Sequence, residues 1–289
     1  MIPSAFEYRR PASLAEAVQL LASHADDAKL LAGGHSLVPM MKLRLALPSM
    51  LIDIGRLREL SGIREHNGTL VIGAGTTHYA VESSALLQQR CPLLVETAAS
   101  IGDVQVRNRG TIGGSTAHAD PAADWPAALL AVGARIKLVH DGGERLIAAE
   151  DFFVDLLTTA MESHEILTEI YVPVNPPGTG SAYCKVLQPA SGFALTGVAA
   201  QVTLGADQTL QQVAVGVTGI SNKAYRARAT EQALQGQVGT PEVLRQAAAR
   251  ATEGVEAMED IHASAEYRLH LTRVYARRAL EQAIARAQA

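Results

Sequence analysis

Two short segments, each with a glycine pair beside hydroxyl residues, constrain this chain more than any other feature. The first is Ala32-Gly33-Gly34-His35-Ser36, which follows an apolar run, and the second is Thr111-Ile112-Gly113-Gly114-Ser115. Glycine has no Cβ, so backbone N–H groups in such turns can approach a ligand closely, and consecutive amides suit an anion such as a diphosphate. Either segment alone also fits an ordinary strand-to-loop turn. Together they predict two loops that close on one extended anionic ligand.

The sequence gives less support to other common nucleotide-binding sites and to metal sites. Neither glycine segment matches the phosphate loop of mononucleotide-binding proteins or the Rossmann fingerprint, which argues against a nicotinamide dehydrogenase. His35 and His118 lack a third ligand at suitable spacing, so we expect no metal site. Asp124 precedes a predicted helix at 125–132. It fits two roles, the N-cap of that helix and the acceptor of a hydrogen bond from a ligand hydroxyl.

Composition narrows the class of protein. The chain has 289 residues, and its net charge of −4 argues against a nucleic-acid binder. Hydrophobic residues make up 48% and charged residues 19%, a globular balance that predicts two or three subdomains. The two cysteines, Cys91 and Cys184, cannot ligate an iron–sulfur cluster or a structural zinc unaided. The first residues do not resemble a signal peptide, and no apolar run is long enough for a membrane span, so we expect a cytoplasmic protein.

The order of predicted elements gives an α+β organisation. A β-α-β-β start over residues 1–56 forms a small layer of its own, and Ser13 opens its helix in a capping-box pattern. The Pro- and Gly-rich segment 174–181 places a domain boundary at 176/177. Residues 103–119 are rich in Gly, Arg and Asn and predict an irregular loop. The other expected elements are helices at 79–87, 92–100, 241–252 and 266–287, and strands at 69–74, 135–139, 181–187, 194–204 and 210–217.

At the glycine segments the sequence resembles a known family. Both segments are similar to the paired FAD pyrophosphate motifs of the medium, flavin-binding subunit of carbon monoxide dehydrogenases, xanthine dehydrogenases and related molybdenum hydroxylases. Residues 101–109 resemble the stretch that leads into the second motif. Residues 189–194 resemble the segment beside the flavin ring, and residues 264–268 resemble the opening of the last helix. These matches follow one another in order along most of the chain.

The resemblance implies a fold and partners. The fold would be an FAD-binding domain of the vanillyl-alcohol-oxidase (PCMH) type over residues 1–176, in subdomains of about 1–56 and 57–176. A C-terminal domain over 177–289 would carry a three-stranded antiparallel sheet with helices. The partners would be a large molybdopterin subunit and a small subunit with [2Fe–2S] clusters, in a dimer of heterotrimers. FAD, bound non-covalently, would take electrons from the clusters and pass them to an external acceptor. An FAD-binding scaffold with little redox role and a stand-alone flavin oxidoreductase are the alternatives.

The resemblance also implies which residues hold the cofactor, although none would be catalytic in the strict sense. Ser115 stands where some relatives have Asp or Asn, and Phe193 where some have Tyr, so a phenolic hydrogen bond would be lost there. Asp124 would bind a flavin hydroxyl, and a cation at Lys185 would favour the anionic reduced flavin. The implied cofactor-binding residues are Ala32, Gly33, Gly34, His35, Ser36, Leu37, Ile101, Thr111, Ile112, Gly113, Gly114, Ser115, Asp124, Leu167, Lys185 and Phe193.

Overall fold

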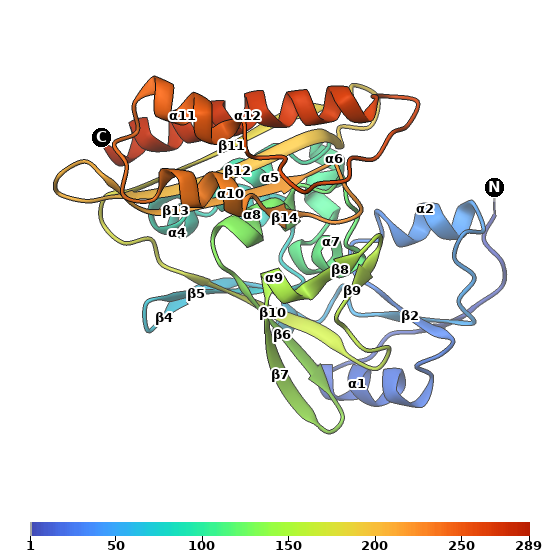
Figure 1. Ribbon diagram of the computed structural model, residues 1–289. Coiled ribbons are helices and arrows are strands. Elements are labelled where there is room, and N and C mark those ends of the chain that lie inside the picture. The colour runs from blue at the N-terminus through green and yellow to red at the C-terminus, as the bar shows by residue number, and fades with distance from the viewer. Residues whose placement is uncertain (1) are drawn as a thin grey trace.

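The structure is a computed structural model that describes residues 2–289. Its N-terminal layer is a parallel sheet in the order β1-β3-β2, which lies at the right of Figure 1. Apolar side chains of α1, among them Val18 and Leu21, pack on Ile52 of β3. Ser13 accepts a hydrogen bond from the Glu16 N–H, so the predicted cap of α1 is confirmed. The layer consists of β1 (Glu7–Arg9), α1 (Leu14–Ser23), β2 (Ala28–Leu31), α2 (Leu37–Lys42) and β3 (Met50–Asp53).

A second, antiparallel sheet follows in the order β4-β5-β10-β6-β7. β10 returns from far along the chain to lie between β5 and β6, with Ile170 opposite both Ile72 and Ile136. These three residues are fully buried in the largest core, together with Trp125. The strands are β4 (Ile63–His66), β5 (Thr69–Gly73), β6 (Arg135–His140), β7 (Gly143–Ala148) and β10 (Ile166–Pro173); the turn η1 (Arg58–Leu60) precedes them, and the small pair β8 (Phe153–Asp155) and β9 (Thr158–Thr159) lies before β10.

Short helices fill the space between this sheet and the C-terminal layer. The predicted helix at 79–87 is two helices, because Ser84 starts a new one by capping Leu87 N–H. The prediction of an irregular loop at 103–119 is wrong: Asp103 and Thr111 each cap a short helix there. The helices are α3 (His78–Glu82), α4 (Ala85–Arg90), α5 (Pro92–Ala99), α6 (Val104–Arg109), α7 (Ile112–His118), α8 (Trp125–Ala131) and α9 (Ala149–Phe152).

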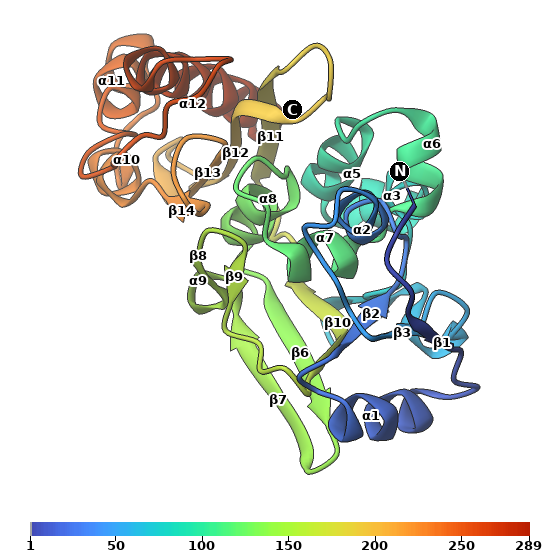
Figure 2. The same cartoon turned by 90° about the vertical axis from the view of Figure 1, so that its right-hand side faces the viewer.

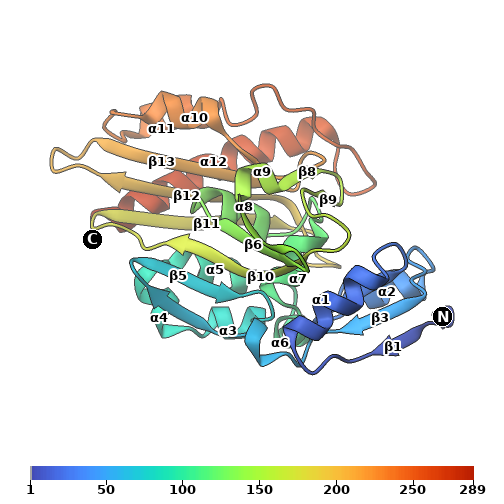
Figure 3. The same ribbon diagram turned by 90° about the horizontal axis from the view of Figure 1, so that it is seen from below.

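The C-terminal layer is an antiparallel sheet in the order β11-β12-β13-β14 with the long helix α12 across it, at the top of Figures 1 and 3. Alternate residues of β12 face opposite ways: Val198 and Val202 pack toward α12, and Ala199 packs toward the core around α8. The sheet has four strands where three were expected. The fourth consists of only two residues, Tyr225 and Arg226, and is too short to show an alternating pattern in the sequence. The elements are β11 (Thr179–Leu187), β12 (Ala194–Leu204), β13 (Leu210–Thr218), β14 (Tyr225–Arg226), α10 (Arg228–Leu234), α11 (Pro241–Ala248) and α12 (Ala265–Ala287).

The group of short helices lies beside these layers, as Figure 2 shows from the side, with the N-terminal layer and the C-terminal helices at opposite corners. The first glycine motif joins β2 to α2, and the second forms the N-terminal turn of α7. Among the helices of residues 2–289, none combines the length and apolarity that crossing a membrane requires.

Candidate functional site

The first diglycine motif, residues 32–36, connects the end of β2 to the start of α2. Gly34 has a φ of +79°, a conformation that costs any other residue strain. Within residues 2–289, no protein group accepts a hydrogen bond from the backbone N–H of Gly33, Gly34, His35, Ser36 or Leu37. The Ser36 hydroxyl does not cap α2 either. Five consecutive main-chain donors are therefore left for water or a ligand.

The two motifs lie against each other, as the sequence predicted. A Cβ placed on Gly33 would lie 2.2 Å from the carbonyl oxygen of Arg109 and 2.9 Å from the Cα of Gly110. A Cβ on Gly114 would lie 3.9 Å from the Cβ of Ala32. The backbones thus touch where only glycine leaves room. The side-by-side arrangement on which a shared ligand depends is confirmed.

The second diglycine motif, residues 111–115, differs from the expected turn because it is the first turn of α7. Its N–H groups are occupied within the protein: Ile112 donates to the Thr76 carbonyl (3.0 Å) and Gly113 to the Ala74 carbonyl (2.8 Å). Gly114 donates to the Thr111 hydroxyl, at 3.1 Å, and Ser115 to the Thr111 carbonyl. The motif therefore offers a ligand the exposed Gly114 and the half-buried Ser115 side chain rather than a row of amides.

A third segment, residues 74–78, braces the second motif, and sequence reasoning missed it. A Cβ on Gly113 would lie 2.4 Å from the Cβ of Ala74, so the helix rests directly on this segment. A Cβ on Gly110 would lie 2.6 Å from Nε2 of His78. The available clue was Gly75-Thr76-Thr77, a glycine and hydroxyl cluster after a strand, like the two motifs themselves.

His78 is a buried, neutral histidine beneath the second motif. The Trp125 indole N–H donates to His78 Nδ1 at 3.1 Å, which places the ring proton on Nε2. Burial, and then the positive charges of His35 and Arg107, lower the pKa of His78 to about 4. The imidazole therefore stays uncharged at neutral pH, and it acts as a packing and hydrogen-bonding group.

Asp124 is engaged by the C-terminal sheet and does not cap α8, so its predicted N-cap role is wrong. Its Oδ1 accepts a hydrogen bond from the Tyr183 hydroxyl (2.5 Å), and Oδ2 accepts one from Lys185 Nζ (2.9 Å). The Asp124 side chain is 5% exposed and that of Lys185 is 6% exposed. Burial raises the pKa of Asp124, which the Lys185 ammonium opposes, and burial with the Asp124 charge raises the pKa of Tyr183. The sequence could not reveal these partners, which lie about 60 residues away.

Lys185 also brings other predicted residues together. Its Nζ donates to the Ser100 carbonyl at 3.0 Å, beside the half-buried Ile101. The next residue, Gly102, meets the loop before β12, where a Cβ on Gly192 would lie 3.3 Å from the Gly102 Cα. Phe193 follows with 46% of its surface exposed. Ile101, Lys185 and Phe193 therefore surround one junction between the α5–α6 loop and the β11–β12 loop.

Leu167 lies elsewhere, in the core of the second sheet. It is 5% exposed and pairs with Leu138 in β6, at an irregularity between Leu167 and Glu169. The neighbouring Thr168 carbonyl accepts a hydrogen bond from Ala74 N–H at 2.9 Å. This links the strand of Leu167 to the segment 74–78, which braces the second motif.

Two recesses of the surface lie apart from the glycine motifs. One, of about 410 Å³, lies between β14 and the chain after α11, and Arg226, Arg228 and Arg250 line it. Each of these arginines is paired with a glutamate. The other, of about 350 Å³, borders residues 75–77. Neither is lined by Gly33, Gly34, Gly113 or Gly114.

Comparisons with known proteins agree along the whole chain. Residues 4–175 match the family model described as the FAD binding domain in molybdopterin dehydrogenase, and residues 181–283 match that of the CO dehydrogenase flavoprotein C-terminal domain. The chain is 43% identical to the carbon monoxide dehydrogenase medium chain of Hydrogenophaga pseudoflava, over 99% of each chain. It is 39% identical to that of Afipia carboxidovorans, over 100% of each.

A solved structure gives the same result for the fold. The carbon monoxide dehydrogenase from Hydrogenophaga pseudoflava that lacks the Mo-pyranopterin moiety of its cofactor superposes with a TM-score of 0.96, at 45% identity and 99% coverage of each chain. The sequence and structural matches both extend through the FAD-binding and the C-terminal domains. The chain therefore belongs to the family of FAD-binding medium chains of carbon monoxide dehydrogenases and related molybdenum hydroxylases.

Proposed function

We propose that this chain holds FAD non-covalently across its two diglycine motifs and relays electrons within a molybdenum hydroxylase complex. The observation that carries the proposal is the row of five unpartnered amides at residues 33–37, directly against the second motif. When bound, FAD supplies the ability to take up electrons singly or in pairs. The chain's own residues bind and orient the cofactor.

The donors of the first motif fit a diphosphate. The chain has a net charge of −4, so a general positive field does not attract the anion. Local main-chain donors can bind it instead, because consecutive N–H groups create a positive concavity. We expect Ala32 to Leu37 to donate to the diphosphate, with the Ser36 hydroxyl as a further donor. On the other side we expect Gly114 to leave room and Ser115 to offer its hydroxyl, while Thr111, Ile112 and Gly113 hold the turn in place.

The junction around Ser100 to Gly102 fits the side of the flavin ring. We propose that Ile101 and Phe193 pack beside the ring, since both are partly accessible where two loops meet. Lys185 fixes this junction through the Ser100 carbonyl, and Asp124 holds Lys185. In this role the buried ion pair orients the residues that meet the cofactor. Leu167 would support the same region from the core.

The wider proposal concerns organisation and partners. We propose an FAD domain of the vanillyl-alcohol-oxidase type over residues 1–176, with subdomains 1–56 and 57–176, and a C-terminal domain over 177–289. A large molybdopterin subunit would oxidise the substrate, and a small subunit with [2Fe–2S] clusters would carry the electrons to this chain. The full assembly would be a dimer of such heterotrimers. The names of the relatives, which are medium chains, support a place in a multi-subunit enzyme.

Ser36→Asp tests the proposed diphosphate site, with Ser36→Asn as the matched neutral control. Asp and Asn both suit the start of a helix, so neither should harm α2. A carboxylate beside the diphosphate should weaken FAD binding by roughly tenfold to a hundredfold, equivalent to about 1–3 kcal/mol. Ser36→Asn should retain the flavin. The measurement is flavin content and the FAD dissociation constant of the purified chain.

Ser84→Asp controls for charge, because it adds a carboxylate at another helix N-cap. Equal flavin content in Ser36→Asp and the wild type would refute the placement of the diphosphate.

The electron-transfer role is tested in the assembled complex. Flavin-poor Ser36→Asp complex should reduce the external acceptor in proportion to its flavin content. A rate equal to that of the wild type would favour the scaffold role instead.

A further inference from the structure

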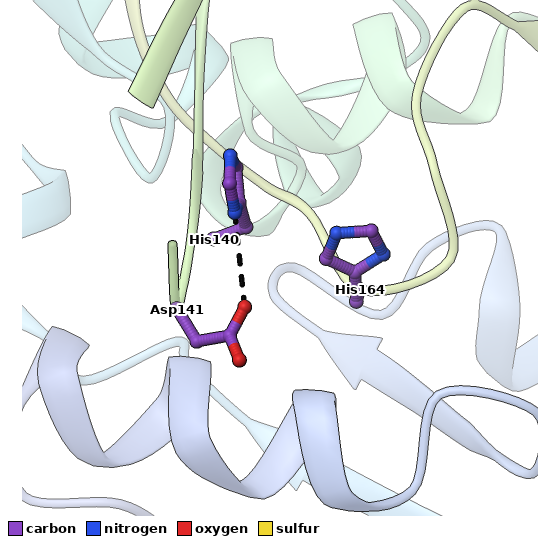
Figure 4. Close-up of side chains that lie close together, drawn as sticks. All are labelled: His140, Asp141 and His164. Atoms are coloured by element: carbon purple, nitrogen blue, oxygen red, sulfur yellow. Dashed lines mark ion pairs between the residues drawn. The ribbon is translucent and has the colours of Figure 1, made fainter. Parts of the chain in front are cut away.

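Two histidines and an aspartate meet at one end of the second sheet, away from the diglycine motifs. His140 ends β6, Asp141 follows in the β6–β7 turn, and His164 lies in the loop before β10. β6 and β10 pair antiparallel with Val139 opposite Ile166, so strand pairing holds the two histidines near each other. One potential ligand atom from each of the three side chains lies within 4.8 Å of the other two. Figure 4 shows the three side chains around a common space.

The local contacts leave ring nitrogens of both histidines able to bind a metal ion. The Gly142 N–H donates to His140 Nδ1 at 3.0 Å, so this nitrogen carries a lone pair. The same atom lies 3.7 Å from Asp141 Oδ1. On the other histidine, Glu162 Oε2 lies 3.7 Å from Nδ1, and Figure 4 shows the second ring nitrogen on the side of His140. A carboxylate behind a histidine is the usual outer-sphere partner of a metal-bound imidazole.

We propose that His140, Asp141 and His164 form a binding site for a divalent transition-metal ion of the zinc, nickel and copper group. Two imidazoles with one carboxylate suit these ions, whereas Mg²⁺ and Ca²⁺ prefer sites made mostly of oxygen. Three protein ligands leave a position for water. Ligand atoms of a tetrahedral zinc site lie roughly 3.3 Å apart. The exposed Asp141 side chain, 61% accessible, can turn to complete the set.

The position of the site indicates what metal binding would do. Val139 and Ile166, the neighbours of the ligands in β6 and β10, pack into the core that the second sheet shares with α1 and β3. A bound ion would tie the β6–β7 turn to the loop before β10 at this junction. Its effect is therefore on the stability of the junction between the N-terminal layer and the sheet. The metal must displace the Gly142 N–H from His140, which opposes binding.

The test is a Zn²⁺ titration of the tag-free, flavin-loaded, full-length chain by calorimetry, with excess Mg²⁺ present. The wild type should bind one Zn²⁺ that the double variant His140→Ala/His164→Ala does not bind. The double variant His66→Ala/His262→Ala is the matched control, because it removes two exposed imidazoles elsewhere. Zn²⁺ should raise the Tm of the wild type and of this control only. Flavin content, equal in all variants, checks folding.

Single substitutions and spectroscopy keep the proposal falsifiable if the double variant folds poorly. His164→Gln should weaken Zn²⁺ binding by tenfold or more, and Asp141→Asn by less. The Cu²⁺ form of the wild type should show coupling to two imidazole nitrogens in electron paramagnetic resonance. Equal Zn²⁺ binding by the wild type and His164→Gln, or displacement of Zn²⁺ by Mg²⁺, would overturn the proposal.

Discussion

The two diglycine motifs share one sequence pattern, yet they have different structural roles. In the first, residues 32–36, Gly34 takes a left-handed conformation and the amides from Gly33 to Leu37 have no acceptor among residues 2–289. In the second, residues 111–115, every amide from Ile112 to Ser115 is occupied within the protein. The first motif is a source of donors. The second is a packing surface that holds the first in position.

This difference shows what a glycine pair alone does not specify. A missing Cβ permits a close approach, but the approaching group can be a ligand or another part of the chain. Gly113 meets the Ala74 backbone, and Gly33 meets the Arg109 carbonyl. The conformation of Gly34 and the free amides beside it distinguish the ligand-facing motif. Substitutions in the two motifs should therefore separate loss of fold from loss of cofactor.

The largest expected effect comes from Gly113→Ala. The added Cβ would lie 2.4 Å from the Cβ of Ala74 and 2.7 Å from its carbonyl oxygen, so the backbone must move. We expect a loss of about 3 kcal/mol or more in the free energy of unfolding of the flavin-free chain, measured with urea. Gly34→Ala, in the first motif, meets only side chains and should cost about 1–2 kcal/mol of backbone strain. Equal losses in the two variants would contradict the division of roles.

A pH-dependent effect of intermediate size should come from His78 beneath the second motif. Its folded pKa of about 4 lies below the ordinary value of 6.5, so between these values the unfolded chain binds the extra proton. Stability is complete above pH 6.5 and falls as the pH drops toward 4, by up to about 3 kcal/mol from this group. His78→Gln can still accept the Trp125 N–H and should lose less stability between pH 7 and pH 4.5.

If the free energy of unfolding falls equally in the wild type and in His78→Gln between pH 7 and pH 4.5, His78 is not the cause of the loss of stability. The first motif gives the comparison a second readout. His35 is exposed there and has only a weak contact with the Gly33 carbonyl, at 3.3 Å. Because the positive charge of His35 also lowers the pKa of His78, His35→Gln should reduce the pH dependence of unfolding, but by less than His78→Gln does.

The sequence predicted well those elements that local chemistry determines. The strand at residues 194–204 was located to the residue, because it is a mostly apolar run bounded by glycines at 192 and 205. Ser13 identified the start of α1, since a cap and its partner Glu16 lie three residues apart. The proximity of the two diglycine motifs also followed from their shared pattern.

Features that depend on distant residues could not be predicted. Helices α6 and α7 have six and seven residues, and the second begins on a glycine-rich stretch. Such a helix is stable only because Ile112 and Gly113 donate to Thr76 and Ala74, which the local sequence does not reveal. Asp124 likewise looked like a helix cap, because Tyr183 and Lys185 reach it only in the folded chain.

The smallest expected effect tests whether the hydroxyl of the second motif serves the fold. Thr111→Val keeps the side-chain shape but removes the acceptor of the Gly114 N–H. The flavin-free chain should lose about 1 kcal/mol of unfolding free energy, the usual value of a helix cap, and Thr111→Ser should keep most of it. If Thr111→Val instead leaves the flavin-free chain as stable as the wild type and weakens FAD binding, the Thr111 hydroxyl is reserved for the ligand. The two motifs would then be alike in function, and the contrast drawn from their amides would not hold.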